Sequence, residues 1–265
     1  MSNAASRILV AAIGLPVVLG AVYVGGWWLF ALLTLVALVA LHEYWLLARS
    51  LRPLAPAGYI GVVLGLVGAE VSGVDWMLGG LLVTLAFAFF LKALADTRQA
   101  ATVAISGTML GAIWVGAGLG FLIVLREIPA HGRLLLFTVL LAVWAGDTFA
   151  YFGGRLLGRH KMAPTTSPGK TWEGFVVGTA ATIFVAFIAL YKQDFISNAH
   201  AIILGVVLAV AAPLGDLFES LLKRDMDVKD TGTLLGGHGG VLDRADALLF
   251  AGPAAYFVVA ALGHA

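Results

Sequence analysis

The sequence predicts an all-α, polytopic integral membrane protein. Its mean hydropathy is +0.99, and 61% of its 265 residues are hydrophobic, whereas soluble domains contain about 45–50% apolar residues. Apolar segments also recur at the roughly 17–25-residue length that an α-helix needs to cross a bilayer. About nine spans are expected, at residues 8–25, 27–47, 57–72, 76–92, 101–125, 134–152, 173–191, 199–219 and 247–263.

The basic residues predict how these spans are oriented. With nine spans, 13 of the 16 Lys and Arg fall on the side of the N-terminus, and only Arg126, Arg133 and Lys192 fall on the other. Basic residues favour the cytoplasmic side of a membrane. We therefore expect a cytoplasmic N-terminus, an external C-terminus and residence in the inner, cytoplasmic membrane. The apolar run after Arg7 lacks a small-residue cleavage site, so we interpret it as a span and not as a removed signal peptide.

Residues 1–130 form the N-terminal region, with spans one to five. Trp27, Trp28 and Trp76 fall at outer span ends, and Tyr44 and Trp45 at an inner one, as expected of interfacial aromatic residues. A polar exception, Glu43, lies near the inner end of the second span. Its side chain either extends to water or contributes to a site, and the sequence favours neither interpretation.

Residues 131–265 form the second region, with spans six to nine and two polar loops at 153–172 and 220–246. Residues 216–246 hold six Asp together with Glu219, His238 and four basic residues, although only 12% of the chain is charged. Each uncompensated charge in hydrocarbon costs at least ~2.5 kcal/mol. We therefore expect these loops to face the cytoplasm and to carry the function. The absence of cysteine excludes disulfides and thiolate catalysis.

Carboxylates in this segment indicate a metal site. On a helix, Asp216, Glu219, Ser220 and Lys223 share one face, and a second pair of acids, Asp243 and Asp246, precedes the last span. Mg²⁺ takes oxygen ligands, usually one or two carboxylates with substrate phosphates and waters. The alternative is that these acids form solvated ion pairs with Lys223, Arg224 and Arg244. Asp216 favours the metal site, because it follows Pro213 inside an apolar run.

Two Gly-containing turns are candidates for phosphate binding. The run 236–240 includes His238, and successive glycine N–H groups before a helix can bind an anion. Residues 167–174 lack the spacing of a Walker A loop, but they offer Ser167, Lys170 and Thr171 to a triphosphate, while Glu173 can cap the next helix. Asp147, an acid inside the sixth span, is a further candidate.

These residues also carry a resemblance to a known family. Ser220-x-Leu222-Lys223-Arg224, then Lys229-Asp230, then His238-Gly239-Gly240-x-x-Asp243-Arg244-x-Asp246 resembles the signature of the phosphatidate cytidylyltransferases, or CDP-diacylglycerol synthases. The segments 147–151 and 167–174 resemble further family features. The chain departs from the usual pattern at Gly169 and Gly236, neither of which is assigned to the chemistry.

The resemblance implies a membrane enzyme, often a homodimer, that uses Mg²⁺ to join CTP and phosphatidic acid into CDP-diacylglycerol and pyrophosphate. It implies Asp216, Asp243 and Asp246 as ligands of one or two cations, with Glu219 as a fourth candidate. Phosphate handling and catalysis are expected of Lys223, Arg224, Lys229, Asp230, His238 and Arg244. Nucleotide binding is expected of Ser167, Lys170, Thr171, Ser220, Gly239 and Gly240.

Two alternative functions are consistent with the residues. A cytidylyltransferase for another lipid phosphate would have the same polar residues, because the apolar helices do not specify the lipid. A secondary transporter would also place charges in a helical bundle, but usually near mid-membrane between inverted repeats. Here the charges gather on one side, which favours metal-assisted, in-line attack of a lipid phosphate on the α-phosphate of CTP. No nucleic-acid partner is expected.

Overall fold

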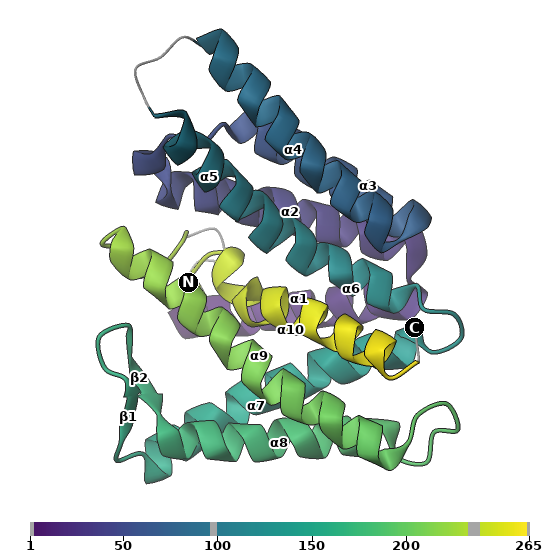
Figure 1. Cartoon of the computed structure of the whole chain (residues 1–265). Helices are drawn as coiled ribbons and strands as arrows, with labels where there is room; N and C mark the ends of the chain where they lie inside the picture. The colour runs from purple at the N-terminus through teal and green to yellow at the C-terminus, as the bar shows by residue number, and fades with distance from the viewer. Residues whose placement is uncertain (1–2, 96–99, 233–238, 264–265) are drawn as a thin grey trace. The chain divides into compact units, whose positions relative to one another are not determined.

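The computed structural model describes residues 3–95, 100–232 and 239–263, with side chains from residue 12 onward (Figure 1). It is helical apart from one two-stranded sheet, which confirms the predicted all-α membrane class. Within the described residues, eight helices are long and apolar enough to cross a membrane. A shorter apolar stretch, Ala12–Val24, coincides with the first predicted span.

The chain forms two compact units. The first contains Met1–Glu127 and Met226–Ala245, and the second contains Ile128–Asp225 and Asp246–Ala265. The first division lies close to the predicted boundary after residue 130. The polar segment 226–245 belongs to the first unit, whereas the sequence placed it with the second region. The reason is local, since the end of this segment hydrogen bonds to Glu43 of the first unit.

The first unit is built from consecutive helices. Two of them, α3 and α4, lie side by side because glycines occupy their points of closest approach (Figure 1). A side chain at Gly68 would meet the backbone of Trp76, and one at Gly80 would meet the backbone of Gly65. The elements are α1 (Asn3–Val24), α2 (Gly26–Leu47), η1 (Arg49–Leu51), α3 (Ala55–Ser72), α4 (Val74–Ala95), α5 (Ala101–Gly111), η2 (Ala112–Ala117) and α6 (Gly118–Arg126).

The elements α5, η2 and α6 form one continuous span with a π-helical middle. Tyr44 of α2 packs against this span, and its hydroxyl donates to the Gly107 carbonyl at 3.0 Å. Tyr44 and Trp45 are buried, so the prediction that they are interfacial is wrong. They fill the core of the unit instead. The tryptophans predicted at outer span ends are exposed, namely Trp27, Trp28 and Trp76.

The second unit contains three long helices, a β-hairpin and most of a fourth helix. Helices α7 and α8 pack closely through glycines (Figure 1). A Cβ atom at Gly174 would lie 2.7 Å from the Ala150 carbonyl oxygen, and one at Gly178 would lie 2.8 Å from that of Gly146. The elements are α7 (Gly132–Leu157), β1 (Lys161–Ala163), β2 (Ser167–Thr171), α8 (Trp172–Leu190), α9 (Asn198–Asp225) and α10 (Leu242–Ala261).

Within the described residues, both predicted loops contain more secondary structure than expected. The segment 153–172 begins with the last turn of α7 and continues into an antiparallel hairpin, in which Lys161 pairs with Thr171 and Ala163 with Ser167. The loop predicted at 220–246 is shorter, because α9 continues to Asp225 and α10 begins at Leu242. Helix α9 extends past its apolar part because Ser220 and Lys223 are buried and bonded there.

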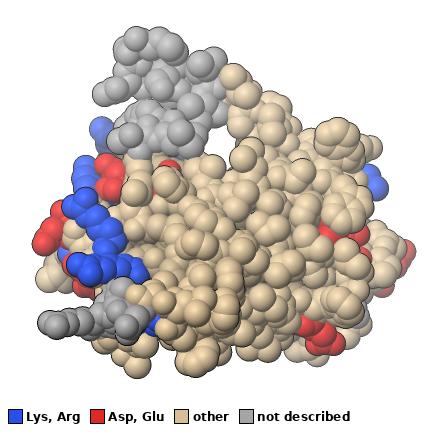
Figure 2. All heavy atoms as spheres, turned by 90° about the horizontal axis from the view of Figure 1, so that it is seen from above, with Lys and Arg blue, Asp and Glu red and all other residues tan. Residues whose placement is uncertain are grey.

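The surface is that of a lipid-facing protein. On the face seen in Figure 2, charged side chains lie toward the edges and uncharged residues cover the middle. Large apolar side chains are exposed in both units, a pattern that soluble monomers avoid. Examples are Trp28, Leu82, Phe89, Val176 and Phe184.

Candidate functional site

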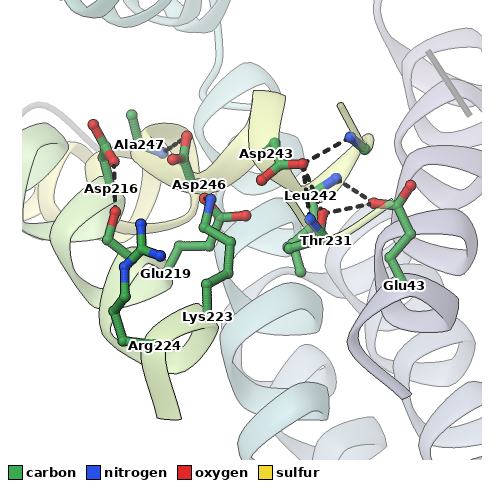
Figure 3. Close-up of polar contacts among 12 residues, drawn as sticks. Glu43, Asp216, Glu219, Lys223, Arg224, Thr231, Leu242, Asp243, Asp246 and Ala247 are labelled. Carbon is green, nitrogen blue, oxygen red and sulfur yellow. Dashed lines mark hydrogen bonds and ion pairs between the residues drawn. The ribbon is translucent and has the colours of Figure 1, made fainter. Parts of the chain in front are cut away.

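A group of carboxylates and lysines lies in the second unit, and Figure 3 shows its members on α9 and α10. The Lys170 Nζ atom on β2 is 2.8 Å from Asp216 Oδ2 on α9. One turn further along α9, the Lys223 Nζ atom is 3.0 Å from Glu219 Oε2. The carboxylate of Asp246 on α10 interacts with Asp216, Glu219 and Lys223. We call these five residues the carboxylate–lysine cluster.

Helical periodicity puts the α9 members of this cluster on one face. That face is turned inward, since Glu219, Ser220 and Lys223 are all buried, and the Ser220 hydroxyl donates to Asp216 Oδ1 at 3.4 Å. The side chains of Lys223 and Glu219 are only 11% and 1% exposed. The alternative interpretation, a solvated surface ion pair, is therefore wrong for these two residues. A buried charge needs a partner, and each supplies one for the other.

Glycine brings α10 against α9 at this cluster. A Cβ atom on Gly215 would meet the Asp246 carbonyl oxygen and would lie 3.2 Å from Ala247 Cα. The rings of Phe218 and Phe250, with centroids 5.5 Å apart, continue this contact. Asp216 follows Gly215 directly, so the close approach of the two backbones places the Asp246 side chain beside it.

The β-hairpin holds Lys170 over the same part of α9. Besides its ion pair with Asp216, Lys170 Nζ donates to the Pro213 carbonyl at 3.4 Å. The Arg224 Nε atom donates to the Thr166 carbonyl at 3.2 Å, which ties the end of α9 to the turn of the hairpin. Residues 167–171 and 216–224, which the sequence singled out separately, therefore meet in one unit.

The other hairpin residues have structural contacts. Thr171 is the N-cap of α8, and its Oγ1 atom accepts the Gly174 N–H at 3.2 Å. The Glu173 carboxylate, which was expected to cap this helix, accepts the His160 backbone N–H at 3.2 Å, and its Oε1 atom lies 2.6 Å from Nδ1 of His160. Ser167 is partly buried on β2. Among the hairpin residues predicted to bind nucleotide, Lys170 is the one that reaches the carboxylate–lysine cluster.

A second polar cluster lies in the first unit, around Glu43 (Figure 3). This side chain is only 4% exposed. Its carboxylate accepts the Leu242 N–H at 2.8 Å and the Val241 N–H at 3.0 Å, and the Thr231 Oγ1 atom lies 3.3 Å from it. The first two donors are at the N-terminus of α10, where an acidic side chain is stabilised by unpaired N–H groups and by the helix dipole. Glu43 therefore does not extend to water.

Asp243 belongs to the same polar cluster as Glu43 and also contacts Thr231. Its Oδ2 atom accepts the Gly240 N–H at 2.7 Å, the Thr231 N–H at 3.1 Å and the Thr231 hydroxyl at 3.0 Å. A metal bound at Asp243 would therefore have to use its other oxygen. The N–H of Gly240, predicted to bind phosphate, is directed to this carboxylate.

The remaining predicted residues are placed as follows. Lys229, Asp230 and Arg244 are exposed. Gly239 has φ +80°, a conformation that favours glycine. His238 lies outside the described residues.

Asp147 lines a small cavity between α7, α8 and α9, about 30 Å³ in volume, together with Thr179 and Pro213 among others.

The three Asp predicted as metal ligands are divided between the units, with Asp216 and Asp246 in the second and Asp243 in the first. Within the described part of the chain, no group of three or more His, Asp or Glu is arranged as a metal centre. Mg²⁺ needs only one or two carboxylates when phosphates and waters complete its shell. Asp216 and Asp246, whose like charges repel each other within one unit, offer carboxylates of this kind.

Comparison with known proteins shows which family these clusters belong to. The sequence profile of the cytidylyltransferase family matches residues 5–262. This chain belongs to the cytidylyltransferase family. Because the match covers nearly the whole chain, both the carboxylate–lysine cluster and the surroundings of Glu43 lie inside the family region.

Individual relatives agree with this membership. The chain is 33% identical to a phosphatidate cytidylyltransferase of Staphylococcus haemolyticus over 93% of this chain and 95% of the relative. It is 32% identical to one of Synechocystis over 97% and 96%. A shorter match, to a Bacillus subtilis protein of the same name, has 41% identity over 57% of this chain and 56% of the relative.

Among the residues of this cytidylyltransferase, sequence reasoning missed Thr231. Its hydroxyl contacts both Glu43 and Asp243, but a threonine after Lys229-Asp230 has no distinguishing pattern in a single sequence. Glu43 did give a signal, since an acid within a long apolar run needs a reason. The sequence could not supply its partners, because they are nearly 200 residues away in the chain.

Proposed function

We propose that this chain transfers the cytidylyl group of CTP to phosphatidic acid, giving CDP-diacylglycerol and pyrophosphate. Full-length relatives bear the name phosphatidate cytidylyltransferase, and a partly buried cluster with both carboxylates and lysines suits a reaction between two polyanions. The observation that carries the proposal is the pairing of Lys170 with Asp216 at 2.8 Å. It brings a cation and a candidate metal ligand together from separate polar segments.

The chemistry is a displacement at phosphorus. A phosphate oxygen of phosphatidic acid attacks the α-phosphorus of CTP, and the bond from that phosphorus to the oxygen bridging to the β-phosphate breaks. Pyrophosphate leaves with the electron pair of that bond. The attacking oxygen is already anionic, so the reaction needs no strong general base. The protein contributes chiefly by positioning the two substrates and by offsetting their charge.

The residues divide this work by their chemistry. Lys170, Lys223 and Arg224 supply positive charge against the phosphates. Asp216 and Asp246, with Glu219 and Asp243 as further candidates, would hold Mg²⁺, which supplies charge neutralisation at the phosphate oxygens when bound. Lys170 and Lys223 form ion pairs with Asp216 and Glu219, so they also reduce the net negative charge of the grouped carboxylates.

The predicted topology fits the same proposal. With 13 of 16 basic residues on the side of the N-terminus, the carboxylate–lysine cluster would face the cytoplasm, where CTP is available. The protein would then work at the inner membrane, with the lipid headgroup at the cytoplasmic interface. We also propose that it works as a homodimer, as the family resemblance implies.

Release of pyrophosphate tests the function. The detergent-purified full chain is given CTP, Mg²⁺ and phosphatidic acid, and each is omitted in turn. The proposal predicts release only when all three are present. Release with another lipid phosphate but not with phosphatidic acid would show that the lipid acceptor is wrong. No release with any lipid phosphate, from protein shown to be folded, would overturn cytidylyl transfer.

A further inference from the structure

We propose that Glu43 is a positioning residue, which fixes Thr231 and the start of α10, and through them Asp243. This inference rests on the proposed function, because that segment carries Asp243 and several of the residues expected to handle phosphate. Nothing in the family resemblance assigns Glu43 a role. Its contacts, all within the first unit, suggest one.

Glu43, on α2, contacts residues from two parts of the segment between α9 and α10. Thr231 lies near the start of the loop and Val241 at its end, ten residues later. The Thr231 Oγ1 atom lies 3.3 Å from the Glu43 carboxylate, while the N–H groups of Val241 and Leu242 donate to it at 3.0 and 2.8 Å. One side chain on α2 therefore ties Thr231 to the start of α10.

Two glycines let the loop backbone approach this carboxylate. A Cβ atom on Gly232 would lie 2.6 Å from Glu43 Oε1, and one on Gly240 would collide with Glu43 Oε2 and lie 2.5 Å from Thr231 Oγ1. Any larger residue would push the loop away from Glu43. Gly232 and Gly240 thus have a local reason besides phosphate binding.

The charge of Glu43 matters as well as its shape. A buried carboxylate is costly unless it is hydrogen-bonded, and here the N-terminus of α10 provides the donors and a favourable dipole. Glu43 thereby fills the position at which an anionic ligand would otherwise bind. Its role is therefore to hold the protein in place and not to contact substrate phosphates.

Thr231 connects Glu43 to a candidate metal ligand. The Thr231 hydroxyl lies 3.3 Å from Glu43 Oε2 and 3.0 Å from Asp243 Oδ2. A change at Glu43 is expected to release Thr231 and the end of the loop, and then to let the Asp243 side chain turn. Asp243 is the residue through which Glu43 would influence the reaction.

Four substitutions test this chain of contacts in the full-length protein. Glu43→Gln keeps the size of the side chain but removes the charge. Gly240→Ala adds the colliding Cβ atom. Thr231→Val removes the hydroxyl, while Thr231→Ser keeps it. The control is Glu70→Gln, a half-buried acid on α3 of the same unit, outside both polar clusters.

Two measurements are made on each variant. The first is hydrogen–deuterium exchange of the backbone at 239–245, which reports whether the loop end and the start of α10 have opened. The second is steady-state kinetics with phosphatidic acid, in which kcat, KM for CTP and the Mg²⁺ concentration for half-maximal activity are each determined. If Glu43 had only a structural role, the protein that remains folded would reach half-maximal activity at the wild-type Mg²⁺ concentration.

We expect Glu43→Gln and Gly240→Ala to exchange faster at 239–245 and to lose roughly 10- to 100-fold in kcat, as is typical when a group behind a metal ligand is removed. They should need more Mg²⁺, with a smaller change in KM. Thr231→Ser should retain more activity than Thr231→Val. Wild-type exchange or wild-type Mg²⁺ dependence in Glu43→Gln would overturn the inference. An inactive wild type would refute the proposed function instead, and exchange would then decide whether Glu43 holds the loop.

Discussion

Lys170 on the β-hairpin and Asp216 on α9 form an ion pair with 2.8 Å between Nζ and Oδ2. This contact joins two polar segments, 46 residues apart in the chain, at the cytoplasmic end predicted for their helices. Lys170 also donates to the Pro213 carbonyl, so it is held by α9 at two points. Under the proposed function, this cation beside a candidate metal ligand would offset negative charge on the phosphate-bearing substrates.

Asp216→Asn should remove most of the activity without unfolding the protein. The amide keeps the size of the side chain but loses the charge that would bind Mg²⁺ and that pairs with Lys170. We expect turnover to fall on the order of 100- to 1,000-fold, the range seen when one strong electrostatic contact to a transition state is lost. Pyrophosphate release and thermal unfolding in detergent measure the two effects. Asp194→Asn, at an exposed acid of the same unit, is the matched control. Near-normal turnover of Asp216→Asn would contradict the metal assignment.

Lys170→Met should lower kcat/KM for CTP by roughly 10- to 100-fold. The change removes a positive charge that we place near the triphosphate, and a bound phosphate typically relies on such charge-assisted contacts. Lys161→Met provides the comparison, because Lys161 is exposed on the neighbouring strand of the same hairpin. Equal kinetics for the two variants would show that the position of the charge is unimportant.

Lys223→Met should destabilise the protein as well as inactivate it. Its side chain and that of Glu219 are both buried, and leaving one member of a buried ion pair alone costs about 3–5 kcal/mol. Adding Glu219→Gln to Lys223→Met should recover much of this stability but none of the activity. The free energy of unfolding and the rate of pyrophosphate release are measured on the same samples. Recovery of activity together with stability would show that Lys223 has only a structural role.

Gly215→Ala should reduce activity through the spacing of α9 and α10. Its Cβ atom would collide with the Asp246 carbonyl, so the two helices must separate and Asp246 must move relative to Asp216. We expect at least a tenfold loss of kcat, measured with saturating CTP and Mg²⁺. Gly169→Ala is the control, because a Cβ atom there has no atom within 4 Å. An unchanged kcat in Gly215→Ala would mean that this spacing is not critical.

Much of the fold follows from the sequence for a simple physical reason. The spans are long apolar segments, and each forms its backbone hydrogen bonds internally, so their approximate positions depend on local composition alone. The exact residues at which the helices end were less predictable. Helix α9 continues to Asp225 because Ser220 and Lys223 find buried partners, and no local pattern reveals those partners. The β-hairpin was missed because its strands, Lys161–Ala163 and Ser167–Thr171, are too short to show alternation.

The site was predicted in its residue types more than in its contacts. Helical spacing indicated that Asp216, Glu219, Ser220 and Lys223 share a face, and the structure confirms this. The contacts of Glu43 and of Lys170 connect residues far apart in the chain, and a single sequence contains no signal for such pairs. For Tyr44 and Trp45 the sequence did give a signal, but it was misleading. Their place at a predicted helix end indicated an interfacial position, and both residues lie in the core.

The most direct test of the central claim follows the α-phosphate of CTP. The purified protein is incubated with phosphatidic acid, Mg²⁺ and CTP that carries a radioactive label on either the α- or the γ-phosphate, and the lipids are then extracted. Cytidylyl transfer predicts that the α-label appears in a lipid that co-migrates with CDP-diacylglycerol, while the γ-label remains in water-soluble pyrophosphate. Lipid labelled from the γ-position, or no labelled lipid from folded protein, would contradict the account.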